Sequence, residues 1–143
     1  MPFRYNPDYV AAWPDAATTA MLSKAGITKA VHMTTFFDGY GQLPHMPPYK
    51  WEGVKQATIV AVEEWRGNGK TKLLVAVVAP EGNWSHEINR HYRSYKARED
   101  LSHVPHVTLN RAVPKGTAKD FQWLVGRVMT FDRHGGDECR YLK

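Results

Sequence analysis

The residues with the clearest chemical potential form two copies of the triplet His-x-Thr. One copy is His32-Met33-Thr34 and the other is His106-Val107-Thr108. Side chains two residues apart in a strand point to the same face, so each histidine is expected to share a face with its threonine. Residues 104–110 alternate polar and apolar side chains, which is the pattern of a half-buried strand. A polar face opposite a buried one indicates a solvent-accessible site, because burying polar groups without partners is costly.

Two histidines can divide the acid and base steps of phosphodiester cleavage between them. One group takes a proton from the nucleophile and another gives a proton to the leaving oxygen. The ordinary pKa of histidine is about 6.5, so near neutrality one imidazole is neutral while the other is charged. Thr34 and Thr108 are expected to donate to the non-bridging phosphate oxygens. On a ribonucleotide the nearest nucleophile is the adjacent 2′-hydroxyl, or water if the substrate is a 2′,3′-cyclic phosphate. The alternative is that the two histidines meet separate structural needs.

The triplets and the order of the segments between them resemble the 2H phosphoesterases, also called LigT-like proteins. That family is defined by two H-x-[ST] motifs on the central strands of two lobes, which residues 32–34 and 105–109 match. The resemblance covers almost the whole chain and includes a long hairpin, a helix and then the Pro-His-x-Thr-Leu strand. Within the superfamily the chain is most similar to the phage anti-CBASS nucleases, which destroy cyclic oligonucleotide immune signals. Thr35 departs from the leucine that more usually follows the first triplet.

The resemblance implies both a fold and an activity. The expected fold is α+β and two-lobed, with antiparallel sheets that line a central groove and helices outside. The expected activity is hydrolysis of the 3′–5′ linkages of a cyclic oligonucleotide, without a metal or other cofactor. One alternative is a phosphodiesterase that processes RNA ends carrying a 2′,3′-cyclic phosphate. Another is a module that sequesters a nucleotide without cutting it, although pure binding does not require two histidines.

Several residues outside the triplets are candidates for substrate binding. Tyr5, Trp51 and Tyr141 lie in predicted loops or near the chain ends, where they are able to stack on a base. Arg111 lies just after the second triplet and is expected to meet a phosphate. Glu138 is a candidate acceptor for a base edge. Ordinary packing or solvent exposure is the alternative for each of them.

The sequence offers no convincing spacing for a metal site. His86-Glu87 with His91 resembles the zincin signature, but its two histidines stand five residues apart and do not share one helical face. We therefore expect a metal-independent mechanism.

Length and composition favour one ordinary globular domain over residues 1–143. The formal net charge of +5 weakly favours anionic partners such as nucleotides, and no obligate protein partner is evident.

The single cysteine, Cys139, excludes an internal disulfide and fits a reducing compartment. The longest apolar run, residues 73–80, is too short to span a bilayer. The first residues lack the layout of a signal peptide. We therefore expect a cytoplasmic protein, in the host cytoplasm if the source is viral.

Helix and turn signals predict the elements that position the triplets. Strands are expected at residues 27–37, 53–65, 72–79, 104–110, 123–132 and 137–142. Helices are expected at residues 14–25 and 83–101, with a helical turn at 117–121. Residues 66–70 are predicted to form a hairpin turn and residues 133–136 another turn. The aromatic segment 1–13 is expected to pack over the domain as neither helix nor strand.

Overall fold

The described strands form one six-stranded antiparallel sheet in a computed structural model that describes residues 9–37, 43–95 and 104–139. The strand order is β2-β1-β6-β3-β4-β5. The strands are β1 (Tyr9–Pro14), β2 (Met33–Phe37), β3 (Lys55–Arg66), β4 (Lys72–Pro80), β5 (His106–Val113) and β6 (Val128–Gly135). Two α-helices, α1 (Ala16–Lys24) and α2 (Trp84–Arg93), pack against this sheet. The predicted α+β class is therefore confirmed.

Short 3₁₀ segments connect several of these elements. They are η1 (Leu43–His45), η2 (Glu81–Asn83), η3 (Thr117–Leu124) and η4 (Asp137–Cys139). The segment η3 joins β5 to β6 and packs on β3. The carboxylate of Glu64, in β3, accepts hydrogen bonds from the backbone N–H groups of Gly116 and Ala118 at the start of η3. These two bonds lower the pKa of Glu64.

None of the helices in the described part of the chain is long and apolar enough to cross a membrane.

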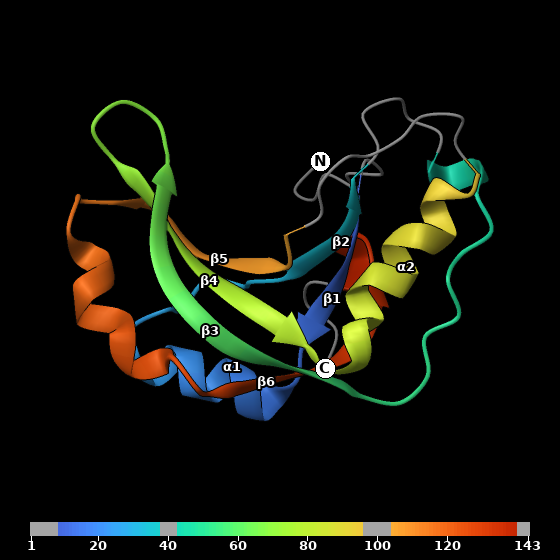
Figure 1. The fold of residues 1–143 in the computed structure, drawn as a ribbon, viewed down its shortest axis with the longest axis horizontal. Helices are drawn as coiled ribbons and strands as arrows, with labels where there is room; N and C mark the ends of the chain where they lie inside the picture. The colour runs from blue at the N-terminus through green and yellow to red at the C-terminus, as the bar shows by residue number, and fades with distance from the viewer. Residues whose placement is uncertain (1–8, 38–42, 96–103, 140–143) are drawn as a thin grey trace.

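The two edge strands of the sheet, β2 and β5, carry the two triplets or directly follow them. These strands are not hydrogen-bonded neighbours, yet their Cα atoms approach within 8 Å. Figure 1 shows how the long hairpin of β3 and β4 bends, so that β5 lies beside β2 in the concave middle of the molecule. Register shifts in the β3–β4 and β4–β5 pairings contribute to this bend, because a bulge increases local twist. A single curled sheet thus brings its edges together, and no two-lobed arrangement is seen among the described residues.

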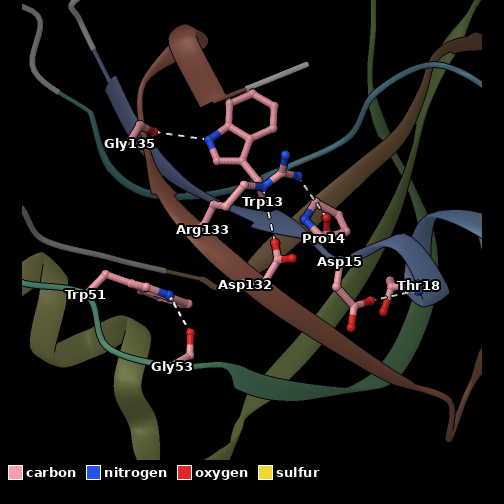
Figure 2. A network of polar contacts seen from close by, with 9 residues as sticks. All are labelled: Trp13, Pro14, Asp15, Thr18, Trp51, Gly53, Asp132, Arg133 and Gly135. Atoms are coloured by element: carbon pink, nitrogen blue, oxygen red, sulfur yellow. Dashed lines mark hydrogen bonds and ion pairs between the residues drawn. The ribbon is translucent and has the colours of Figure 1, made fainter. Parts of the chain in front are cut away.

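The helix α1 begins at Ala16, two residues after the predicted start, because Pro14 is the last residue of β1 and Asp15 is the N-cap. The Asp15 carboxylate accepts a hydrogen bond from the backbone N–H of Thr18 at 2.8 Å, which caps the first turn (Figure 2). Leu22 and Thr18 are its buried residues. Gly26 then adopts a φ of +86°, a conformation that suits glycine at the end of a helix.

The helix α2 is fixed on β2 by polar and aromatic contacts. The Asn89 side-chain amide donates to the Thr35 carbonyl at 2.8 Å, and the Tyr92 ring stacks on Phe36 with centroids 5.4 Å apart. Asn83 precedes this helix in a left-handed conformation and forms no side-chain capping bond. The helix ends at Arg93, and residues 96–101 of the predicted helix lie outside the described residues.

The strand predictions fail mainly in the part of the sheet around β1. Residues 9–14 form a strand between β2 and β6, although the sequence predicted neither helix nor strand there. Five of its six residues are buried, so it lacks the alternation by which a half-buried strand is recognised. Residues 27–32, predicted as part of a strand, precede β2 and lie outside it.

The chain beyond residue 123 also differs from the prediction. The strand expected at 123–132 begins only at Val128, because η3 extends to Leu124 and Gly126 turns with a φ of +93°. The predicted turn at 133–136 is wrong, since Arg133, His134 and Gly135 continue β6 by pairing with β1. Residues 137–139 form η4 in place of a strand, and residues 140–142 lie outside the described residues.

Candidate active site

Both triplets line one cavity of about 210 Å³ between the meeting edges of the sheet. His32 lies just before β2 and Thr34 lies in it, while His106 and Thr108 come from β5. In β5 the partly exposed His106 and Thr108 alternate with the buried Val107 and Leu109, as the sequence predicted. The structure therefore brings together the four residues expected to carry the chemistry.

The imidazole of His106 has one nitrogen occupied by the backbone. Its Nδ1 lies 2.8 Å from the carbonyl oxygen of Val104. A carbonyl only accepts, so Nδ1 carries the hydrogen and Nε2 is the acceptor of the neutral ring. The ring also lies against the indole of Trp65, with centroids 4.6 Å apart and planes at 48°. These two contacts fix the tautomer and the orientation of His106.

The imidazole of His32 is held by two aromatic rings of β1. The Tyr9 ring stacks on it at a centroid distance of 5.0 Å, and the Trp13 ring lies at 4.8 Å. The Tyr9 hydroxyl donates to the Asp137 carboxylate. The Trp13 indole N–H donates to the Gly135 carbonyl at 3.2 Å (Figure 2). Both rings are thus anchored by the end of β6 and by η4. The two triplet histidines therefore have different surroundings, aromatic on two sides for His32 and one aromatic plus a carbonyl for His106.

The structure explains locally why a threonine, and not a leucine, stands at position 35. The β1–β2 register passes from Val10–Phe36 to Ala11–Thr34, so Thr35 has no partner in the ladder. This bulge leaves Thr35 fully buried next to the buried Phe36. Its hydroxyl lies 3.1 Å from the Val10 carbonyl and 2.7 Å from Nε2 of His134. A threonine suits this position because its hydroxyl gives the partly buried His134 ring nitrogen a polar neighbour.

His134 is a partly buried histidine that the sequence placed in a turn. Its ring stacks on Trp51 with centroids 5.7 Å apart and planes at 7°, and Tyr49 approaches it edge-on. Burial is the main cause that lowers the pKa of His134 to about 4, and the nearby His91 lowers it further. His134 is therefore neutral near pH 7.

The other predicted binding residues have mixed placements. Arg111 lines the cavity of the triplets. Trp51 is not among the described residues that line it, since it packs on His134 and donates its indole N–H to the Gly53 carbonyl at 2.8 Å (Figure 2). Glu138 belongs to η4. Tyr5 and Tyr141 lie outside the described residues.

Sequence reasoning missed Lys29 and Trp65, which the fold adds to the site. Lys29 lines the cavity beside Arg111 and supplies a second cation. Asn110, which the alternation of residues 104–110 placed on the polar face with His106, also lines the cavity and supplies an amide. Lys29 lies three residues before His32, close enough in sequence to have been considered. Trp65 carried no such signal, because it is far from His106 along the chain and reaches it only through the pairing of β3, β4 and β5.

Comparisons with protein-family models, with curated proteins and with solved structures find no match to this chain.

Proposed function

We propose that this protein is a phosphodiesterase of the 2H type that hydrolyses 3′–5′ linkages of cyclic oligonucleotides. The observation that carries the proposal is that His32, Thr34, His106 and Thr108 line one cavity. Two imidazoles and two hydroxyls around one phosphate supply an acid, a base and two donors for the non-bridging oxygens. The triplets' resemblance to the 2H phosphoesterases, and the similarity to phage anti-CBASS nucleases, support the same activity in immune evasion. The proposal also includes the two-lobed fold of that family.

The residues of the cavity supply the acid and the base of the cleavage step, and the attacking oxygen comes from water or from a ribose 2′-hydroxyl of the substrate. The neutral histidine removes a proton from the attacking oxygen, which forms a new bond to phosphorus. The bond from phosphorus to the leaving oxygen breaks, and the charged histidine gives that oxygen a proton. Lys29 and Arg111 line the same cavity and offset the negative charge of the phosphate. Nε2 of His106 is the atom suited to proton transfer, because Nδ1 is engaged by the Val104 carbonyl.

A second candidate is the phosphodiesterase that opens 2′,3′-cyclic phosphates at RNA ends. The size of the cavity favours it, since about 210 Å³ is less than the roughly 300–1,000 Å³ of pockets for drug-sized ligands. A terminal cyclic phosphate with one sugar is a small target. Both candidates use the same four residues and differ in how much of the substrate is held.

Incubation of the purified protein with cyclic dinucleotides and with a nucleoside 2′,3′-cyclic phosphate, followed by separation of the products, tests the proposal. Linear products from the cyclic dinucleotide are the expected result. Turnover of the cyclic phosphate alone would support the second candidate. Tight binding without products, unchanged in the His106→Ala variant, would indicate a sequestering module.

A further inference from the structure

A second cavity, of about 240 Å³, adjoins the cavity of the triplets. It lies between α1, the connection from α1 to β2, and the strands β1 and β6. Lys29, Ala30 and Val31 line both cavities. A single segment, residues 29–31, thus forms a common wall of the two cavities.

The sizes of the two cavities suit a ligand of two units. Each alone is smaller than the roughly 300–1,000 Å³ of pockets for drug-sized ligands, whereas the two together fall within that range. A substrate confined to the first cavity leaves the second without a role in the proposed reaction.

The lining of the second cavity suits a nucleoside. Trp13, Leu22 and Ile27 line it but are almost fully buried, so they form a narrow apolar floor against which the edge of a base can pack. The hydroxyl groups of Thr19 and Thr28 are available for its polar edge or for the sugar. A base needs both kinds of contact, because its faces are apolar while its edges carry donors and acceptors.

Arg133 gives this cavity a fixed cation. Its guanidinium donates to the Pro14 carbonyl at 2.9 Å and pairs with the Asp132 carboxylate at 3.1 Å (Figure 2). The side chain is 22% exposed, so these contacts hold it in place at the wall beside Trp13. Because Asp132 offsets the charge of Arg133, it is Lys29 on the common wall that supplies the net positive charge that complements a phosphate-linked ligand.

We propose that the second cavity holds a nucleoside adjacent to the scissile phosphate, so that the substrate is at least a dinucleotide unit. This inference rests on the proposed function, because the phosphate is assigned to the cavity of the triplets. It favours an oligonucleotide over a nucleoside 2′,3′-cyclic phosphate, which has no second unit.

Blocking the second cavity tests this inference by equilibrium binding. Thr19 and Ala20 are neighbouring exposed residues of α1, but only Thr19 lines the cavity. We would introduce Thr19→Trp, with Ala20→Trp as the matched control, into the inactive His106→Ala protein. Calorimetry then gives the affinity for cyclic di-AMP and for adenosine 2′,3′-cyclic phosphate, which carry the same base. Thr28→Trp, on the connection after α1, is a second way to fill the cavity.

Thr19→Trp is expected to weaken the binding of cyclic di-AMP by roughly tenfold or more relative to that of the mononucleotide, because one base contact is worth about that much affinity. Ala20→Trp should leave both affinities in place. Three results would overturn the inference. They are an equal loss of affinity for the two ligands, no loss of affinity for cyclic di-AMP in both Thr19→Trp and Thr28→Trp, and no binding of cyclic di-AMP to the parent protein. Binding in the expected pattern without hydrolysis by the wild-type protein would instead overturn the proposed phosphodiesterase and support the two-unit site.

Discussion

The imidazole of His106 rests against the indole of Trp65, with ring centroids 4.6 Å apart. The Trp65 indole N–H donates to the Glu63 carboxylate at 2.9 Å, which holds the indole in place. Trp65 touches a proposed catalytic group and is not among the described residues that line the cavity. It is therefore a positioning residue for His106.

Trp65→Ala is expected to lower kcat of the proposed phosphodiesterase by roughly tenfold to a hundredfold with little change in KM, because a misplaced catalytic group acts on the transition state. Trp65→Phe keeps an aromatic face and should restore most of the rate. Trp123→Ala removes a half-exposed indole that contacts Arg127, and it serves as the control. Steady-state kinetics on all three variants provide the measurement. A fall in thermal stability with unchanged kcat would assign Trp65 a packing role only.

Replacing His32 or His106 with alanine is expected to cost roughly 10²–10⁴-fold in turnover, the usual contribution of general acid or base catalysis. The double variant should lose little more than either single variant, because the two groups act as a unit. The rate of the wild-type protein should follow a bell-shaped pH curve. Single-turnover rates across pH measure all three properties, and near-normal turnover in one variant would exclude that histidine from the mechanism.

Turnover is expected to survive EDTA. The argument rests on the residues, since no three of the His, Cys, Asp and Glu side chains in the described ranges gather closely enough to hold a metal ion. The measurement is the rate after dialysis against EDTA, compared with the rate after a divalent ion is added back. Loss on chelation and recovery on addition would contradict the metal-independent mechanism.

The folded protein is expected to lose stability as the pH falls from about 6.5 to about 4. The pKa of His134 is about 4 in the fold, below the ordinary value of 6.5, so the unfolded chain binds a proton that the folded chain does not. This contribution to the free energy of unfolding is complete above pH 6.5 and is lost below the folded pKa. The slope approaches about 1.4 kcal/mol per pH unit between those values.

Urea unfolding at several pH values measures this slope. His134→Gln keeps a polar neighbour for Thr35 and should flatten the slope, although the variant starts from a lower stability. His45→Gln replaces an exposed histidine and is the matched control. An unchanged slope in His134→Gln would show that other groups cause the acid sensitivity.

Tyr5 stays a predicted stacking partner for a base of the substrate. Tyr5→Ala in the inactive His106→Ala protein should weaken binding of a cyclic dinucleotide by roughly tenfold or more. Tyr5→Phe should bind almost normally, because stacking uses the ring. Calorimetry gives the affinity and thermal melting gives the stability of the same proteins. A lower melting temperature with unchanged affinity would assign Tyr5 to packing of the N-terminal segment.

Local sequence patterns determined the elements that carry most of the proposed chemistry. The alternation around His106 and Thr108 predicted β5, and the Asn-Gly turn predicted the hairpin of β3 and β4. Asp15 and Gly26 marked the ends of α1. These features depend on neighbours within a few residues, so they can be read from the chain alone.

Tertiary structure decided which distant residues meet. Strand β1 was missed because it is buried between β2 and β6 and shows no alternation. The strand β6 passes through a Gly-rich predicted turn because β1 pairs with it there, and this pairing places His134 opposite Ala12. The common cavity of His32 and His106 arises from the curl of one sheet, which joins its two edge strands. Sheet curvature and long-range pairing sum over many residues, and no local pattern specifies them.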